Sequence, residues 1–422
     1  MKNLLNWANK PFAAYPDITE RIVYLFIFLF PIAGMSIRHW ITNIFNILML
    51  IALFSIRKQR TPLLQQEKLF LWICAAYFSM FVISSLANGW GKPQTYYLGT
   101  ELRFIMVIPI YILLRRYSDC STWLLRGAIL GGFFLIGQAF YDIYVLNDGR
   151  ALGVYSKNII GPLSVLIGYW ALYSIWHNFT QLKWPAGLII TLSIISAFTT
   201  AALSSSRGGY VGFIFTGLAC VMFFSKPRWM IASFASLCLI AFLFYQNIGN
   251  VNGGINTAKD EIQQYFHAKE HATDDSSKTS VGVRLEMIRT GMLFVLDSPF
   301  VGIGPGNYST KTQTYIKEGK AHPETAKHNY PHNAFIEVAS AKGIIGLITL
   351  LLLFYYPAFI FIKGYKKCKH TAVLGLIHIT AISAFSLTDH SVLVMNNYSS
   401  ILLLGLSIFL SSHIRACNLN SH

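Results

Sequence analysis

The chain has 422 residues, of which 54% are hydrophobic and only 12% are charged. A soluble domain usually has about 25% charged residues, so this composition excludes an ordinary soluble protein and indicates a membrane protein. The net charge of +16 could indicate nucleic-acid binding, but most of the basic excess lies in short connections between apolar runs, where it orients a membrane protein. We therefore expect no nucleic acid among the partners.

Apolar runs of roughly 20 residues recur along nearly the whole chain, which predicts membrane-spanning helices. The polar lead-in from Met1 to Arg21 shows no cleavage site, so the first run is expected to be retained as a helix. The fold class that follows is all-α, a polytopic membrane protein with about 12 transmembrane helices and one large, partly helical periplasmic loop. The expected helix cores are residues 22–36, 40–56, 69–87, 98–114, 123–146, 159–177, 184–204, 209–224, 229–248, 334–362, 371–387 and 398–414.

Lysine and arginine gather in alternate connections, such as residues 57–68 and 363–369, and are sparse in the others. By the positive-inside rule both termini are cytoplasmic, and the even number of spans agrees with this. In a bacterium the chain would lie in the inner membrane, with the long polar loop facing the periplasm. Three regions are expected: residues 1–248 with transmembrane helices 1–9, residues 249–333 as the periplasmic loop domain, and residues 334–422 with helices 10–12.

The long loop is the part of the chain least suited to lipid, and its acidic and basic residues are equal in number. Apolar residues after Arg284 follow helical spacing, so an amphipathic helix is expected to end near Asp297. The glycine-rich turn from Gly302 to Gly306 could cradle a phosphate with backbone N–H groups. Because polar segments are costly in a membrane protein unless they meet water or a polar ligand, this loop is the expected place for chemistry.

Two arginines are candidates for binding an anion, because a guanidinium matches the geometry of phosphate oxygens. Arg207 lies in the small-residue sequence SSSRGG where a predicted span reaches the outer side, and the alternative is that it snorkels to the interface. Arg284 lies near the start of the amphipathic helix, where phosphate binding is favoured. The alternative for Arg284 is an ordinary surface charge beside Glu286, and Arg289 is a candidate of the same kind.

Two histidines precede a predicted span. Asn333 is expected to cap that helix, which would hold His332 just above the membrane, where a neutral imidazole can accept a proton from a sugar hydroxyl. The alternative is a hydrogen-bonded interfacial histidine. His328 is the rival base, and the spacing of the two also permits a zinc pair, although Pro331 argues against a helix there.

Two other charged residues near span ends complete the candidates. Arg103 lies beside Glu101 at the start of a predicted span, and Asp389 lies beside His390 at the end of another. Each pair either faces the same outward cavity as supporting groups or forms a local ion pair.

The combination of motifs resembles the O-antigen ligase/polymerase superfamily of bacterial envelope glycosyltransferases. The resemblance rests on SSSRGG at the end of a mid-chain span, RLEMIRTG and SPFVGIGPGNY in the outer loop, and PHNAFIE followed by KGIIGL at the entry to a late span. The stretch RALGVYSKN, residues 150–158, is similar to another outward-loop motif of the superfamily. The order of these motifs covers roughly the whole chain.

The resemblance implies an activity, partners and roles for residues. Such enzymes transfer a glycan from undecaprenyl pyrophosphate to an acceptor hydroxyl at the periplasmic face, with inversion and with no metal or other cofactor. The two essential arginines of the family correspond to Arg207 and Arg284, and its essential histidine to His332. His328, Arg289, Arg103 and Asp389 are then supporting candidates.

The chain length and the span count look like the ligase branch, in which the acceptor is lipid A–core. An O-antigen polymerase or a protein O-oligosaccharyltransferase would use the same chemistry on another acceptor. A polysaccharide transporter is the remaining alternative, although transporters usually place polar groups near mid-membrane and have related halves.

Overall fold

The computed structural model describes residues 17–55, 62–178, 182–224, 260, 261, 263, 279–388 and 395–419. These residues form helices and connecting turns, with no β-strand among them. The helices are α1 (Ile18–Leu29), α2 (Trp40–Ser55), α3 (Gln65–Ala87), α4 (Lys92–Glu101), α5 (Arg103–Leu114), α6 (Cys120–Phe140), η3 (Tyr141–Val145), α7 (Lys157–Asn178), α8 (Trp184–Leu203), α9 (Arg207–Phe224), α12 (Ser280–Asp297), α13 (Tyr308–Lys317), η5 (Pro323–Lys327), α14 (Ala334–Gly364), α15 (Lys369–Thr388) and α17 (Asn396–Leu419).

Eight helices of the described part of the chain are long and apolar enough to cross a membrane. Three more predicted spans fall on the shorter helices α1, α2 and α9, and the predicted span 229–248 lies outside the described residues. An all-helical, multi-pass membrane protein is therefore confirmed. The count of about 12 spans, the periplasmic position of the loop and the boundaries after residues 248 and 333 stay predictions.

The first helix ends earlier than its hydropathy suggests. Apolar residues continue to residue 36, but α1 stops at Leu29 and residues 30–39 form turns. Pro31 has no N–H to donate to the helix. The backbone of Phe28 and Pro31 instead lies directly against Gly127 and Gly131 of α6, where a larger side chain would overlap it. Close packing on α6 therefore accompanies the early end of α1.

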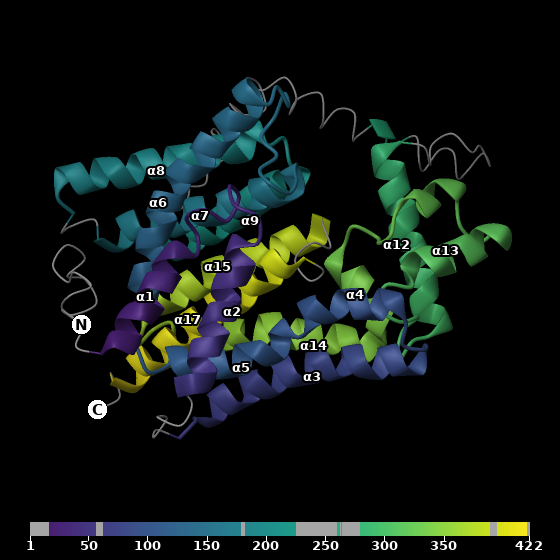
Figure 1. Cartoon of the computed structure of the whole chain (residues 1–422), viewed down its shortest axis with the longest axis horizontal. Helices are drawn as coiled ribbons and strands as arrows, with labels where there is room; N and C mark the ends of the chain where they lie inside the picture. The colour runs from purple at the N-terminus through teal and green to yellow at the C-terminus, as the bar shows by residue number, and fades with distance from the viewer. Residues whose placement is uncertain are drawn as a thin grey trace.

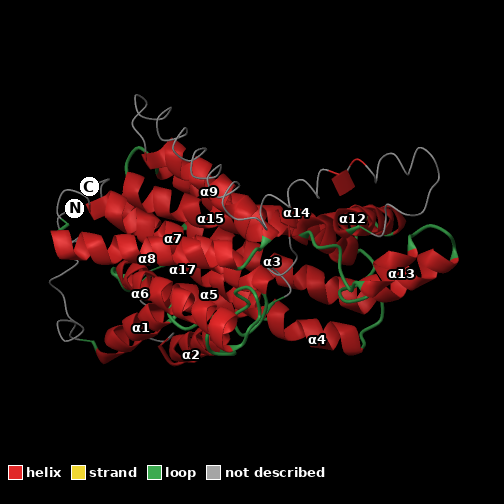
Figure 2. Ribbon diagram, turned by 90° about the horizontal axis from the view of Figure 1, so that it is seen from above, coloured by secondary structure: helices red, strands yellow, loops and turns green. Residues whose placement is uncertain are grey.

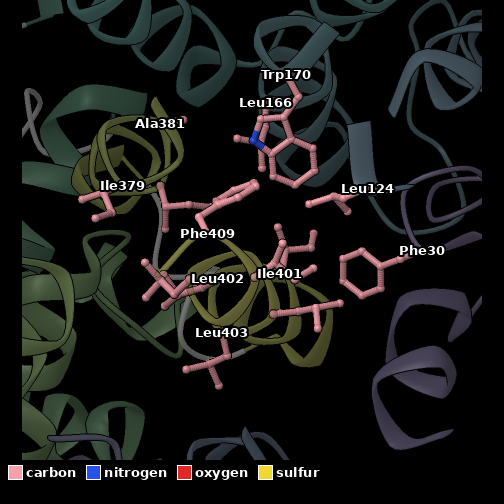
Figure 3. Packing of buried hydrophobic residues seen from close by; sticks show 14 of the residues in the cluster. Phe30, Leu124, Leu166, Trp170, Ile379, Ala381, Ile401, Leu402, Leu403 and Phe409 are labelled. Atoms are coloured by element: carbon pink, nitrogen blue, oxygen red, sulfur yellow. The ribbon is translucent and has the colours of Figure 1, made fainter. Parts of the chain in front are cut away.

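Helix α17 forms the centre of the bundle. Every residue from Asn397 to Ile414 is buried, although only one side of a typical surface helix is apolar and buried. Figure 3 shows Phe409, Leu402 and Ile401 of α17 among side chains of α6, α7 and α15, and the ring of Trp170 meets that of Phe409 edge to face. The same helix also lies against α5 and α2. Because α17 is surrounded on all sides, its serines are buried, and hydroxyls such as those of Ser400 and Ser407 donate to carbonyls of the helix itself.

The bundle has two different ends. The start of α1 and the end of α17 lie at one end, and α12 and α13 lie at the other (Figures 1 and 2). Helix α12 lies across the end of the bundle near the start of α14 and packs on that helix. The helices α12 and α13 thus lie opposite the start of α1 and the end of α17, and which side of a membrane each end faces stays a prediction.

Helix α14 is interrupted at Gly343, where φ is 73° and ψ is −177°. The segment 299–304 of the outer loop fills the interruption. Ile303 N donates to Ser340 O at 2.9 Å, Gly304 N donates to Ala341 O at 3.1 Å, and Ile344 N donates to Pro299 O at 2.7 Å. Backbone groups that a broken helix would leave exposed to lipid are thus paired inside the protein.

Helix α3 supports this junction from the other side. Ser84 Oγ donates to Ala341 O at 2.7 Å, and Asn88 Nδ2 donates to Gly302 O at 3.0 Å. The N–H groups of Gly302, Ile303 and Gly304 all donate to backbone carbonyls. These three N–H groups are therefore not available to a phosphate, and the glycine-rich turn has a structural role instead.

We predict that Gly343→Ala destabilises the protein strongly. A Cβ atom at this position would overlap the carbonyl of Phe300 and lie 2.6 Å from Val301 N, and φ is in the left-handed region. The expected loss is at least about 2 kcal/mol, because backbone atoms cannot move aside as a flexible side chain can. Thermal unfolding of the purified protein in detergent measures the effect.

Gly137→Ala is the matched control, since Gly137 lies within α6 and its Cβ would meet nothing within 4 Å. Its unfolding temperature should stay equal to or slightly above that of the wild type. Equal unfolding temperatures for the two variants would contradict the proposed tight junction at Gly343.

Candidate functional site

Arg207 is the first residue of α9 and follows a tight turn after α8. Ser205 adopts a left-handed backbone conformation with φ of 51°, and Ser206 Oγ accepts a hydrogen bond from Gly209 N at 3.4 Å. Gly209 lies against the backbone of Gly161 in α7, so only a small residue fits there. The sequence SSSRGG therefore forms a compact helix start that presents Arg207, half-buried, at the bundle end.

The connection between η3 and α7 lies beside this turn. Ala151 N donates to Leu203 O at 3.0 Å, which ties the connection to the end of α8. The buried carboxylate of Asp142 accepts hydrogen bonds from Leu152 N at 2.8 Å and Gly153 N at 2.7 Å. Asp142 thereby orders the segment that carries Arg150 and Lys157.

His332 directly precedes the cap of α14. The side chain of Asn333 accepts hydrogen bonds from Phe335 N and Ile336 N, each at 3.0 Å, which confirms the predicted N-cap. His332 itself has φ of 51°, an uncommon conformation for a residue other than glycine. Such a conformation costs about 1–3 kcal/mol and persists only where the surroundings require it. The imidazole is therefore held at a fixed helix start.

The end of α15 connects Arg207 with His332. Asn333 Nδ2 donates to Leu387 O at 3.0 Å, and a Cβ at Gly208 would lie 2.9 Å from Thr388 Oγ1. Leu387 and Thr388 are neighbours in the chain, so the residues next to Arg207 and next to His332 both contact the same turn of helix. The neighbours of two candidates that are far apart in the chain thus contact the same end of α15.

Arg284 lies in the first part of α12. Thr279 caps this helix by accepting from Gly282 N at 3.0 Å, and α12 packs on α14 with Gly291 directly against Ile336. The charge of Arg284 acts on Lys157 at the start of α7 and on His328 before α14. The charges of Arg207 and Arg150 act on Lys157 as well. The basic residues of three separate segments therefore share one electrostatic environment.

His328 lies at the end of η5, with its ring centre 5.6 Å from that of His332. Partial burial lowers the pKa of His328 below its ordinary value, and the nearby charges of His332 and Arg284 lower it further. A histidine with a lowered pKa is neutral at pH 7, so His328 is able to accept a proton. The ring of Tyr330 lies 4.8 Å from that of His332 and covers one side of it.

The supporting candidates have separate surroundings. Arg289 donates to Glu286 at 3.0 Å and to Lys320 O at 3.2 Å, with 44% of its side chain exposed. Arg103 is buried and donates to Gly99 O, to Asn396 Oδ1 at 2.8 Å and to Ser400 Oγ at 2.9 Å. Arg103 thus connects α5 to α17, and Arg289 connects α12 to the segment after α13. Asp389 lies outside the described residues.

Two basic residues that the sequence does not predict as site residues, Lys157 and Arg150, share the electrostatic environment of Arg207 and Arg284. Both belong to the RALGVYSKN stretch, which resembles a family motif but gives no role to its basic residues. The signal for them is that two cations stand in a short outward connection where lysine and arginine are otherwise sparse. A cluster of Arg150, Lys157, Arg207 and Arg284 repels itself and is suited to a ligand with several negative charges.

Comparison with known proteins agrees with the resemblance. Residues 192–351 match the family model described as O-antigen ligase. The chain is 23% identical over 350 residues to an uncharacterised protein of Haemophilus influenzae, covering 81% of this chain and 85% of that protein. It is 25% identical over 267 residues to an O-antigen ligase of Escherichia coli, covering 61% of this chain and 59% of that protein. Arg207, Arg284, His328 and His332 lie inside the matched segment.

We predict that Arg284→Met raises the pKa of His328. The substitution removes a positive charge that disfavours protonation of the imidazole, while an unbranched side chain of similar length is kept. The titration midpoint of His328, followed by NMR on histidine-labelled protein, should move to higher pH.

Arg289→Met provides the control, because the guanidinium of Arg289 pairs with Glu286 and is not among the charges that act on His328. Its midpoint should equal that of the wild type. An unchanged midpoint in Arg284→Met would show that Arg284 and the histidines do not share a site.

Proposed function

We propose, from the match of residues 192–351 to the family model described as O-antigen ligase, that the chain is a glycosyltransferase of the ligase type. It would transfer a glycan from undecaprenyl pyrophosphate to a sugar hydroxyl of lipid A–core, at the periplasmic face of the inner membrane, in lipopolysaccharide biosynthesis. The observation that supports the proposal is a chain of electrostatic interactions, in which Arg207 and Arg284 both act on Lys157 and Arg284 and His332 both act on His328.

Charge supports the assignment of the donor. A pyrophosphate is already a stable leaving group, and its departure needs neutralisation of negative charge more than it needs a proton. Arg207 and Arg284, joined by Lys157 and Arg150, would supply this neutralisation from fixed helix starts. A guanidinium also forms two parallel hydrogen bonds to phosphate oxygens, which orients the donor as well as binding it.

The histidine supports the assignment of the chemistry. The acceptor oxygen would attack the anomeric carbon on the face opposite the pyrophosphate, forming the new glycosidic bond as the bond to phosphate breaks. The pyrophosphate leaves with the electron pair, and a ring nitrogen of His332 takes the proton of the acceptor hydroxyl. Inversion at the anomeric carbon follows from this single displacement, which needs no metal. A positioned base contributes roughly 10²–10⁴-fold to such a step.

The acceptor is the finer part of the proposal. The match to a protein named O-antigen ligase supports lipid A–core. An O-antigen polymerase would use another lipid-linked glycan, and a protein O-oligosaccharyltransferase would use a serine or threonine hydroxyl. These three activities share a donor site and differ only in the acceptor.

We predict that His332→Ala abolishes glycan transfer while the protein still folds. Transfer is measured with purified protein, a synthetic undecaprenyl pyrophosphate glycan and purified lipid A–core. The rate should fall by at least about 100-fold, because the base is removed and the donor site is not. Arg207→Lys and Arg284→Lys should keep part of the activity, since lysine retains the charge but not the planar fork.

Arg289→Lys is the matched control, because this arginine is held by Glu286 and Lys320 outside the cluster. It should transfer glycan at the wild-type rate, and EDTA should not inhibit any of the variants that are active. Full activity of Arg284→Ala would remove that residue from the donor site, and inhibition by EDTA would contradict the metal-free mechanism.

We predict that a strain lacking this gene accumulates lipid-linked polymer and carries bare lipid A–core. This outcome identifies the acceptor, because the polymer is made but cannot be attached. Gel analysis of the lipopolysaccharide and of the lipid-linked pool provides the measurement. Core capped with single repeats would instead indicate a polymerase, and loss of glycan from proteins alone would indicate a protein transferase.

A further inference from the structure

Two interrupted helices face each other beneath the outer loop. Helix α4 ends at Glu101 and α5 begins at Arg103, and α14 is interrupted at Gly343, one residue after Lys342. Lys342 Nζ donates to Glu101 Oε1 at 2.6 Å, so the two interruptions are joined by an ion pair. Side chains and backbone at interrupted membrane helices often bind ions, because the ends of helix segments carry partial charges.

A small cavity lies beside this ion pair. It is lined by Glu101, Glu337 and Lys342, by Tyr77 of α3 and Tyr97 of α4, and by Gly306 of the outer loop, together with neighbouring apolar residues. Its volume of about 20 Å³ is enough for one water or one small ion, since a water needs a cavity of about 10–15 Å³.

Three buried oxygen atoms belong to the residues that line this cavity. Tyr77 Oη, Glu101 Oε2 and Glu337 Oε2 have no hydrogen-bond partner among the described residues. Their side chains belong to residues that are 0%, 6% and 7% exposed. Buried oxygen atoms without a partner are costly, by roughly 1–3 kcal/mol each and more when charged. Three of them around one small space indicate a ligand that accepts lone pairs.

The charges around the cavity do not balance. When both carboxyl groups are ionised, Glu101 and Glu337 bring two negative charges, whereas Lys342 brings one positive charge that is already bonded to Glu101 and lies 3.8 Å from the centre of the Tyr77 ring. Arg103 is directed to Asn396 and Ser400 of α17. One negative charge is therefore left over in a buried place, where an uncompensated charge costs several kcal/mol.

We propose that this cavity binds one monovalent cation of the size of sodium, with Tyr77 Oη, Glu101 Oε2 and Glu337 Oε2 as ligands. Oxygen atoms of carboxylates and hydroxyls are the ligands that hard cations prefer. A single positive charge balances the cavity, whereas a divalent ion would place an excess positive charge next to Lys342. The cation site is separate from the donor site and does not depend on the proposed transferase activity.

The test is thermal unfolding of the purified full-length protein in detergent, with sodium chloride replaced stepwise by choline chloride at constant ionic strength. A ligand that binds only the folded state raises the unfolding temperature and then saturates. We expect sodium to do this for the wild type. Glu337→Gln should lose the sodium dependence, because it removes both a ligand and the charge that the cation balances.

Tyr77→Phe keeps the ring that contacts Lys342 and removes only the unpartnered hydroxyl, so it serves even if Glu337→Gln does not fold. The sodium concentration at half-saturation should rise by about tenfold or more in this variant, as is usual when a metal site loses a supporting group. Glu324→Gln removes a carboxylate that pairs with Lys327 in the outer loop, and its sodium dependence should equal that of the wild type.

Two results would overturn the proposal. Stability that depends on pH and not on sodium would mean that a proton on one of the two carboxylates balances the charge. Stability that depends on neither would mean that the cavity holds only water, and a sodium dependence that is unchanged in Tyr77→Phe would mean that sodium binds without Tyr77 Oη as a ligand. Neither result bears on transfer by His332, so the two proposals are tested separately.

Discussion

The interruption of α14 at Gly343 is the constraint on which the arrangement of the outer loop depends. A helix that breaks within a membrane protein leaves backbone groups that lipid cannot satisfy. Here the loop segment 299–304 pairs with the backbone on both sides of the break, and α3 adds side-chain hydrogen bonds. The loop is therefore part of the bundle and not a separate lid. Because α12 directly precedes this segment in the chain, its position is fixed by the same junction.

The position of α12 determines where Arg284 lies, and the position of the first half of α14 determines where His332 lies. The donor and base candidates then depend on helix starts and not on flexible loops, which is the arrangement that catalysis by positioning requires. Asn333 caps α14 and at the same time donates to Leu387, so the end of α15 is tied to the imidazole segment. Gly208 brings Arg207 to the same place, because a larger residue there would overlap Thr388.

The sequence predicts most helices and their caps, but it does not predict contacts between segments that are far apart in the chain. Hydropathy locates most helices, and the Asn333 cap and the end of α12 at Asp297 are local patterns that held. Hydropathy does not locate the end of α1, because Pro31 and its packing on α6 act against an unbroken apolar run. The glycine-rich turn read as a phosphate cradle pairs with α14 instead, since its partner lies about 40 residues away and no local pattern reveals it. The partners of Arg103 in α17 are likewise distant in the chain, whereas Arg289 pairs with Glu286 at the local i,i+3 spacing.

The two charged regions have opposite signs, and this difference separates their roles. The cluster around Arg207 and Arg284 gathers positive charge, which is suited to an anionic ligand. The cavity around Glu101 and Glu337 is small and is lined by two carboxyl groups. Both regions use the first half of α14, since Glu337 and Lys342 follow His332 within three helical turns. A cation between Glu101 and Glu337 would stabilise the helix segment that carries the imidazole, without taking part in the chemistry. Under the two proposals, buried charges near His332 would thus help to hold the proposed base in place.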